Sequence, residues 1–257
     1  MRPSLALLAL LALPASCHRP APLRESSREQ PIANPLASKP DPVPEALHFE
    51  ELAMQGDLPA WALRGSTKHE DRFIFLSGIC SHPLGYAQSF AQAAAERGDM
   101  ITLQGDVPCG GPYRKWSYDL PTIAKRIDAV LAAAGIASRD LTLIGYSQGA
   151  AIAERLIARY PGKFTRAVLM ASPIVPSPAR LHALDAAVFM AGTLDSQTNM
   201  RAGQHALEQA HIPVTFQPIP GARHGQMGNT PDATMASALG WLDENARGHV
   251  TPGDLVR

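Results

Sequence analysis

One pentapeptide constrains the fold of this chain more than any other segment: Gly145-Tyr146-Ser147-Gln148-Gly149. It follows the apolar run Leu141-Thr142-Leu143-Ile144 and precedes a segment in which Ile152, Leu156 and Ile157 share one helical face. A strand, Gly-x-Ser-x-Gly and a helix in this order predict a tight turn in which the serine backbone is strained and its neighbours are small. The turn would project the serine hydroxyl from the carboxyl edge of a sheet. The motif alone also occurs by chance, so its interpretation depends on the residues around it.

Apolar strand-like runs alternate with helical patterns along most of the chain. We expect strands at residues 61–64 (an edge strand), 72–76, 100–103, 141–144, 167–170, 187–190 and 213–216, and helices at 86–97, 122–134, after Ser147 and at 232–247. This alternation predicts an α/β fold with a mostly parallel central sheet flanked by helices on both faces. The segment from Ser172 to Pro178 between two strands is too short for a helical lid, so no large lid domain is expected.

The first 17 residues have the pattern of a signal peptide. Arg2 precedes a run of leucine and alanine from Leu5 to Leu13, and Pro14-Ala15-Ser16 leads to Cys17. The run is too short to span a bilayer. The cysteine after Ala-Ser is similar to a bacterial lipoprotein signal, although such signals usually have leucine where Pro14 stands. We predict export, with a lipid anchor at Cys17 in the cell envelope; the alternative is a periplasmic or secreted protein without the lipid.

Residues 18–47 are rich in proline and are predicted to form a disordered tether, which leaves residues 48–250 for one catalytic domain. The chain is 46% hydrophobic and 18% charged, with a formal net charge of zero. Because no basic stripe is present, a nucleic-acid partner is not expected. No metal-ligand spacing occurs, and we expect no cofactor. The domain is expected to be a monomer that contacts a membrane only through Cys17.

A serine hydroxyl needs an adjacent base to act as a nucleophile, and a carboxylate that orients the base. Asp195 directly follows the strand that ends at Met190, whereas Asp185 precedes that strand and would lie at the wrong edge. His224 follows the strand that ends near Ile219. The other histidines stand elsewhere: His205 and His211 precede that strand, His182 comes earlier, and His249 lies beyond the last helix. Taken alone, Asp195 would be a turn or helix-cap residue; the order Ser147, Asp195, His224 favours a catalytic triad.

An acyl-transfer site also needs two backbone N–H donors for the oxyanion. One is expected from Gln148, directly after the serine. The second is expected from the segment Ser77-Gly78-Ile79-Cys80, where Ile79 is the first choice and Cys80 the second. The alternative for Ser77-Gly78 is a plain turn from strand to loop.

From about Leu58 to Arg247, the chain resembles an α/β-hydrolase. The segment Gly145–Gly149 and the short loops of Asp195 and His224 resemble the group of carboxylesterases, phospholipases and acyl-protein thioesterases, and also the dienelactone hydrolases. That group usually has His-Gly in the oxyanion loop, where this chain has Ser77-Gly78. The resemblance implies a serine hydrolase that cleaves carboxylic ester or thioester bonds through an acyl-enzyme.

The remaining cysteines, Cys80 and Cys109, each follow a strand of the predicted sheet. In an exported protein these positions favour a disulfide that would stiffen the oxyanion loop; two free buried thiols are the alternative.

A site without a lid suits small or flexible ester substrates. Its walls are expected to include Cys80, His82, Tyr113, Trp116, Ile174 and Val175, each of which could equally serve packing. Two rival functions stay open. One is a serine peptidase on the same fold, and the other is a non-catalytic surface lipoprotein that keeps the fold as a binding module.

Overall fold

The computed structural model describes residues 47–65 and 70–247, all within a compact unit that spans Glu45–Arg257. The signal peptide predicted at 1–17, including Cys17, lies outside the described residues. So do residues 18–46 of the predicted tether and residues 248–250 of the predicted catalytic domain. No helix in the described ranges is long and apolar enough to cross a membrane.

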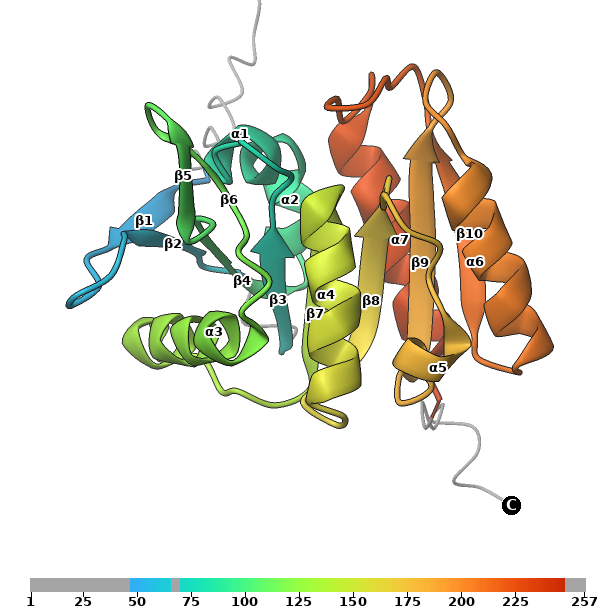
Figure 1. The fold of residues 1–257 in the computed structure, drawn as a ribbon, viewed down its shortest axis with the longest axis horizontal. Coiled ribbons are helices and arrows are strands. Elements are labelled where there is room, and N and C mark those ends of the chain that lie inside the picture. The colour runs from blue at the N-terminus through green and yellow to red at the C-terminus, as the bar shows by residue number, and fades with distance from the viewer. Residues whose placement is uncertain (1–46, 66–69, 248–257) are drawn as a thin grey trace, which may run out of the picture. The chain divides into compact units, whose positions relative to one another are not determined.

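An eight-stranded sheet forms the centre of the domain, in the order β1-β2-β4-β3-β7-β8-β9-β10 (Figure 1). The strands are β1 (Phe49–Leu52), β2 (Ala60–Leu63), β3 (Asp71–Leu76), β4 (Gly98–Leu103), β7 (Leu141–Tyr146), β8 (Phe164–Met170), β9 (Ala186–Gly192) and β10 (Val214–Ile219). From β4 to β10 all neighbours pair in parallel, and only the pairs β1–β2 and β2–β4 are antiparallel. The mostly parallel sheet is therefore confirmed. The edge position predicted for residues 61–64 is wrong, because β1 pairs with the outer side of β2.

Helices cover both faces of the sheet, as predicted. The helical segments are α1 (Leu84–Ala87), the short 3-10 helix η1 (Gln88–Phe90), α2 (Ala91–Ala95), α3 (Leu120–Ala134), α4 (Gln148–Arg159), α5 (Pro178–Leu181), α6 (Thr198–Gln209) and α7 (Pro231–Asn245). Buried side chains of α3, α4, α5 and α6 form one core cluster with the sheet, and those of η1, α2 and α7 form a second on the other face. Every residue of β7 is buried, which agrees with its place between two helix layers.

The helix predicted at residues 86–97 is not continuous. Phe90 leaves the helical conformation at φ −128° and ψ 25°, and α2 begins anew after it. The Asp232 carboxylate at the start of α7 accepts a hydrogen bond from the Ala93 N–H at 2.9 Å. This contact satisfies one of the free N–H groups in the first turn of α2. A partner distant in the sequence thus stabilises a helix start that local periodicity does not indicate.

A short hairpin of β5 (Val107–Gly110) and β6 (Tyr113–Lys115) stands apart from the main sheet and was not predicted. An isolated antiparallel bridge between Ser81 and Arg114 joins the hairpin to the segment that follows β3. The hairpin therefore lies against the predicted oxyanion loop, at the carboxyl edge of the sheet.

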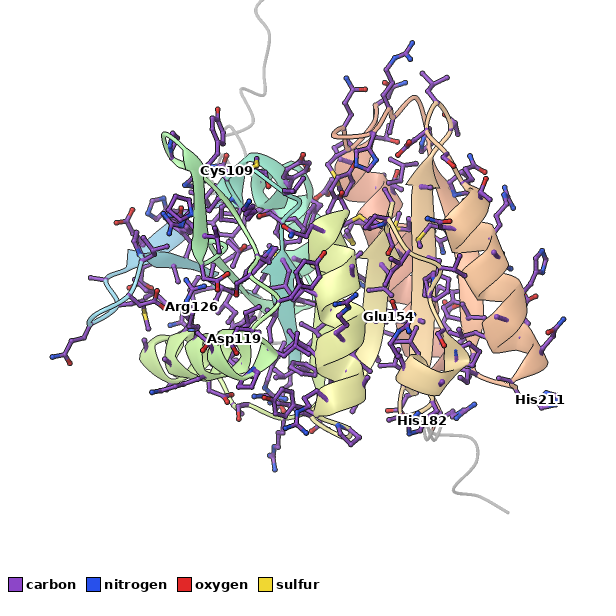
Figure 2. The ribbon with its side chains drawn as sticks, in the orientation of Figure 1. Cys109, Asp119, Arg126, Glu154, His182 and His211 are labelled. Atoms are coloured by element: carbon purple, nitrogen blue, oxygen red, sulfur yellow. A yellow bond between two sulfur atoms is a disulfide. The ribbon has the colours of Figure 1, made fainter. Side chains whose placement is uncertain are left out.

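The connection from β8 to α5 is a short loop, and no lid domain is inserted anywhere in the described ranges. Glu154, labelled on α4 in Figure 2, holds this loop. Its Oε1 accepts hydrogen bonds from the Ser177 N–H at 2.7 Å and from Arg180 Nε at 2.8 Å. Burial raises the pKa of the Glu154 carboxyl, against the opposing effects of Ser177 and Arg180. The buried Glu154 carboxylate on α4 thus holds this loop in place through its two hydrogen bonds.

Gly149 is the position at which α4 approaches β3 most closely. A Cβ there would lie 2.0 Å from the Leu76 carbonyl oxygen. Gly149→Ala should therefore lower the free energy of unfolding by about 3 kcal/mol or more, because backbone rather than a flexible side chain must move. Gly85→Ala is the matched control, since nothing lies within 4 Å of its Cβ, and its change should stay within about 0.5 kcal/mol. Equal denaturant midpoints for the two variants would contradict this close approach.

Candidate active site

Ser147 occupies a strained turn between β7 and α4. Its backbone has φ 51° and ψ −116°, a conformation that L-residues rarely adopt. Gly145 and Gly149 make the turn possible: a Cβ on Gly145 would lie 2.6 Å from the Ala150 Cα, and one on Gly149 would contact the Leu76 carbonyl. The pentapeptide thus forms the predicted turn, with the serine at the carboxyl end of β7.

The structure brings Ser147, His224 and Asp195 together from the carboxyl ends of three strands. Ser147 Oγ lies 3.1 Å from His224 Nε2, and His224 Nδ1 lies 2.8 Å from Asp195 Oδ2. With the proton on Nδ1, the imidazole donates to the carboxylate and Nε2 is free to accept the serine proton. Asp195 is largely covered, with 15% of its side chain exposed, whereas 54% of the His224 side chain is exposed.

The loops of Asp195 and His224 are hydrogen-bonded to each other. The Leu194 N–H donates to the Ala222 carbonyl at 3.0 Å, and the Gly221 N–H donates to Thr193 Oγ1 at 2.9 Å. Gly192 permits this contact, because a Cβ there would lie 2.1 Å from the Ala222 carbonyl oxygen. The acid and the imidazole therefore belong to one connected unit at the edge of β9 and β10.

The loop after β3 lies beside Ser147. A Cβ on Gly78 would be 3.4 Å from the Ser147 Cβ, so the backbone of this loop approaches the serine closely. Ser81 Oγ donates to the Gly78 carbonyl at 2.7 Å and fixes the turn. Ile79 follows with its side chain exposed. The segment predicted to carry the second oxyanion donor therefore begins beside Ser147, and the role of Ile79 in it stays a prediction.

Gln148 is the first residue of α4, so its own N–H has no partner within the helix. Its side-chain amide pairs with the backbone of Trp116. Gln148 Oε1 accepts from the Trp116 N–H at 3.0 Å, and Gln148 Nε2 donates to the Trp116 carbonyl at 3.1 Å. The Trp116 indole Nε1 in turn donates to the Ser77 carbonyl at 2.9 Å. One tryptophan therefore connects both segments expected to bind the oxyanion.

These contacts correct the prediction that Trp116 lines the substrate pocket. The residue is 2% exposed and belongs to the core cluster under α3 and α4. Burial of a tryptophan requires a hydrogen-bond partner for its indole N–H, and Ser77 supplies it.

The other predicted wall residues lie around the same edge in different surroundings. Cys80 forms a disulfide with Cys109, labelled in the hairpin in Figure 2, and the two Cα atoms are 5.3 Å apart. His82 packs on Trp61 with ring centroids 4.9 Å apart, and burial lowers the pKa of its imidazole. Tyr113 and Val175 are exposed, and Ile174 is half-buried.

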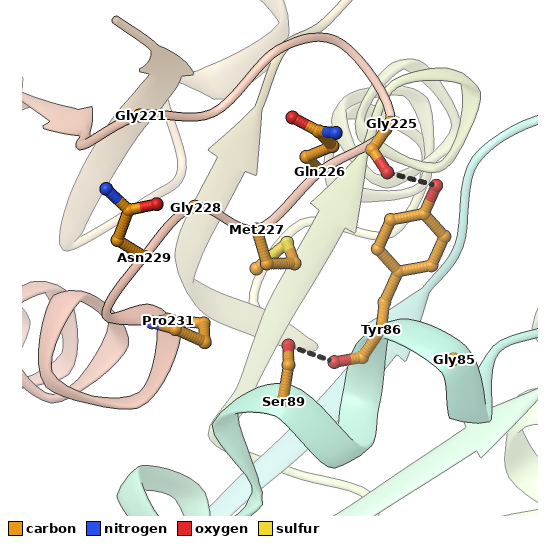
Figure 3. A pocket seen from close by; sticks show the side chains of 10 residues that line it. All are labelled: Gly85, Tyr86, Ser89, Gly221, Gly225, Gln226, Met227, Gly228, Asn229 and Pro231. Carbon is orange, nitrogen blue, oxygen red and sulfur yellow. Dashed lines mark hydrogen bonds between the residues drawn. The ribbon is translucent and has the colours of Figure 1, made fainter.

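A pocket of about 480 Å³ lies between the His224 loop and the helical segments α1 and η1 (Figure 3). It is lined by α1 and η1 on one side and by parts of residues 221–231 on the other, and none of the predicted wall residues belongs to it. His182 and His211 lie near the amino ends of the strands, at the end of the sheet opposite this loop (Figure 2). In the described ranges, no group of three or more His, Cys, Asp or Glu side chains could hold a metal ion.

Two tyrosines that were not predicted contact the His224 loop. Tyr146 Oη accepts a hydrogen bond from the Gly225 N–H at 2.6 Å, and the Tyr146 ring lies 5.7 Å from the imidazole, centroid to centroid. Tyr86 stacks on Tyr146 at 5.0 Å and donates to the Gly225 carbonyl at 3.4 Å. The residue before the serine in a Gly-x-Ser-x-Gly motif gives no indication of such contacts, since they depend on a loop 79 residues away.

The pairing of Gln148 with Trp116 yields a stability prediction. Gln148→Ala leaves a buried N–H and a buried carbonyl without partners, so it should lower the free energy of unfolding by about 2–4 kcal/mol. Gln88→Ala, at an exposed position on the surface, should change it by less than about 0.5 kcal/mol. Urea denaturation of both variants measures the difference, and a Gln148→Ala protein as stable as wild type would exclude the two buried hydrogen bonds.

Tyr146 also predicts a pH dependence. Burial raises the pKa of its phenol to about 12, above the value of about 10 for a free tyrosine. Because the folded pKa is the higher one, the neutral phenol stabilises the fold fully below pH ~10, and this contribution is lost as the pH rises toward 12. The stability of wild type relative to Tyr146→Phe should therefore fall across this range. A difference that stays constant from pH 9 to 12 would contradict the burial of the phenol.

Several solved structures with a similar fold are distant in sequence. A membrane phospholipase A described as a novel bacterial virulence factor is 18% identical, with a TM-score of 0.56 over 77% of this chain and 86% of that one. Esterase PE8 is 18% identical, with a TM-score of 0.53 over 69% and 95%. An S-formylglutathione hydrolase from Staphylococcus aureus is 13% identical, with a TM-score of 0.58 over 77% and 99%. At these identities the likeness concerns the fold.

A search of curated protein sequences found no significant match. A family model described as alpha/beta hydrolase fold matches residues 77–213, from the loop after β3 to the start of β10. The matched range is more than half of the chain and contains both Ser147 and Asp195. The match to this family model supports hydrolase activity, and the described family fold agrees with the observed arrangement of strands and helices. The chain belongs to the α/β-hydrolase family.

Proposed function

We propose that this protein is a serine hydrolase that cleaves carboxylic ester or thioester bonds through an acyl-enzyme. The observation that supports it most strongly is the series of contacts Ser147 Oγ to His224 Nε2 at 3.1 Å and His224 Nδ1 to Asp195 Oδ2 at 2.8 Å. These distances suit proton transfer from the serine to a base whose tautomer is fixed by a carboxylate.

In the proposed reaction, Ser147 Oγ attacks the carbonyl carbon while His224 takes its proton. His224 then gives that proton to the leaving alkoxide or thiolate, and an acyl group remains on Ser147. Water attacks the acyl-enzyme with the same imidazole as base, which releases the acid and restores the serine. The Asp195 carboxylate accepts the hydrogen bond from Nδ1–H and stabilises the imidazolium that forms in each step.

The Gln148 and Ile79 N–H groups are the proposed donors to the oxyanion. Gln148 begins α4, so the positive end of the helix dipole adds to its N–H. Gly78 lets the backbone before Ile79 approach Ser147. Each donor would contribute roughly 3–4 kcal/mol of transition-state stabilisation if it resembles measured oxyanion donors.

We favour ester bonds over peptide bonds because the described ranges contain no lid domain inserted between the strands. The connection after β8 is a short loop, and the hydroxyl of Ser147 lies at an edge where 54% of the His224 side chain is exposed. A peptidase usually holds an extended chain against the enzyme to align an unreactive amide, and the described ranges have no inserted lid domain that could do this. Ester and thioester substrates need less alignment because their leaving groups are better.

The test is a series of p-nitrophenyl esters of increasing acyl length, with aminoacyl p-nitroanilides assayed beside them. Wild type should hydrolyse the esters and bind a fluorophosphonate probe at Ser147. Ser147→Ala should lose at least about 1,000-fold in kcat and all labelling, because the nucleophile is gone. Ser237→Ala, an exposed serine of α7, is the control and should keep both.

Each alternative outcome has its own meaning. Anilide cleavage that exceeds ester cleavage would favour the serine peptidase. A folded wild-type protein that neither labels nor turns over any ester would favour the binding module and overturn the proposal.

A further inference from the structure

We propose that Tyr146 is a positioning residue that holds the His224 loop at reacting distance from Ser147, with Tyr86 as its support. This inference rests on the proposed function and assigns a role to the variable residue that precedes the nucleophile. It is argued from the contacts of the His224 loop, from the pocket behind that loop and from the surroundings of Tyr146.

The His224 loop is rich in glycine. Gly221, Gly225 and Gly228 all have positive φ angles, between 71° and 87°. Glycine has the greatest backbone freedom of any residue, so a loop with three of them gains much entropy when it is released. Its flanks are fixed by the hydrogen bonds of Gly221 to Thr193 and of Asn229 to the Pro220 carbonyl. The crest, defined as residues 223–226, needs other contacts to stay in place.

Part of the crest borders a pocket instead of packed side chains. The pocket of about 480 Å³ in Figure 3 lies against Gly225, Gln226 and Met227, so no side chain fills the space behind them. Within the crest, the Gln226 N–H donates to the Arg223 carbonyl at 3.1 Å, which shapes the turn without fixing its place. In the described part of the chain, the hydrogen bonds from the crest to other elements go to Ser147, Asp195, Tyr86 and Tyr146.

Tyr146 is suited to fix this distance because it is bonded to the nucleophile. It directly precedes Ser147, and its Oη accepts from the N–H of Gly225, the residue directly after His224. One rigid side chain therefore spans from the peptide beside the nucleophile to the peptide beside the base. The ring also lies beside the imidazole at 5.7 Å and limits its tilt toward the core.

Tyr146 is itself held firmly. It is 2% exposed, and the Tyr86 ring stacks on it with centroids 5.0 Å apart and an interplanar angle of 25°. Tyr86 is backed by Phe75, whose ring centroid is 6.3 Å away, and donates to the Gly225 carbonyl. Both polar groups of Gly225 thus bond to tyrosines, one accepting and one donating, as Figure 3 shows for Tyr86. Burial raises the pKa of Tyr146, so the phenol is neutral throughout the working range of a histidine base.

The consequence concerns turnover rather than binding. A shift of the imidazole by about 1 Å can cost on the order of 100-fold in rate, because proton transfer depends steeply on geometry. The Tyr146 hydroxyl bonds to the His224 loop, so we expect ground-state binding to stay nearly intact when this hydroxyl is removed. A purely structural role would instead reduce the fraction of folded enzyme and leave each remaining site fully active.

The experiment compares Tyr146→Phe with wild type on a p-nitrophenyl ester, with kcat expressed per active site counted by fluorophosphonate titration. Tyr146→Phe keeps the ring and loses only the hydroxyl. We expect kcat per site to fall about 10- to 100-fold, KM to change less than twofold and labelling to stay stoichiometric but become slower. Tyr160→Phe, at the other end of α4, is the matched control and should behave as wild type.

Tyr86→Phe keeps the stack and loses the weaker 3.4 Å hydrogen bond, so its kcat should fall by less than that of Tyr146→Phe. The inference is overturned if kcat per site in Tyr146→Phe equals wild type, or if only KM or the number of titratable sites changes. Failure of the proposed function is recognised separately, since wild type itself would then show no labelling at Ser147.

Discussion

The turn at Ser147 is the constraint on which the rest of the structure depends. Two segments of backbone meet there without side chains between them: a Cβ at Gly149 would lie 2.0 Å from the Leu76 carbonyl, and one at Gly145 would lie 2.6 Å from the Ala150 Cα. This contact lets α4 start directly over β3 and β7. It also forces the serine to φ 51°, which costs on the order of 1–3 kcal/mol. The buried strands around it, β7 above all, supply the packing that keeps such a conformation in place.

The segments that carry the site residues are held in place by different sets of contacts. Ser147 and Gln148 are fixed by a buried strand and a helix start, and the loop of Ile79 is fixed by the Trp116 indole, by Ser81 and by the disulfide of its neighbour Cys80. Asp195 is tied to Gly192 and to the loop of Ala222. The crest that bears His224 is the least supported part, because an open pocket lies behind it. The His224 side chain, which must accept and release protons, is also more exposed than that of Asp195.

How far the sequence predicts this arrangement depends on whether a feature is local or distant. Ser147, Asp195 and His224 can be placed from order alone, because parallel strands bring their carboxyl ends to one edge whatever the details of packing. Seven of the eight strands of the main sheet follow from local apolar runs, whereas β1, with the sequence Phe-Glu-Glu-Leu, has no such run and was not predicted. Trp116 was assigned wrongly to the pocket because a tryptophan after a loop has no local mark that separates a wall from a core. Its burial depends on Ser77 and Gln148, which lie 39 and 32 residues away.

The break in the helix predicted at residues 86–97 is a second feature that depends on residues distant in the sequence. Its alanine-rich pattern is compatible with one continuous helix, and helix propensity along the segment is high. The helix instead ends at Phe90, whose side chain is buried in the core. A new helix follows, in which the Ala93 N–H donates a hydrogen bond to the Asp232 carboxylate. The segments before the break, α1 and η1, line the same pocket as the His224 loop, and Tyr86 of α1 stacks on Tyr146. The tertiary contact between Ala93 and Asp232 thus overrides local helix propensity next to the candidate active site. The periodicity of the sequence does not indicate this contact.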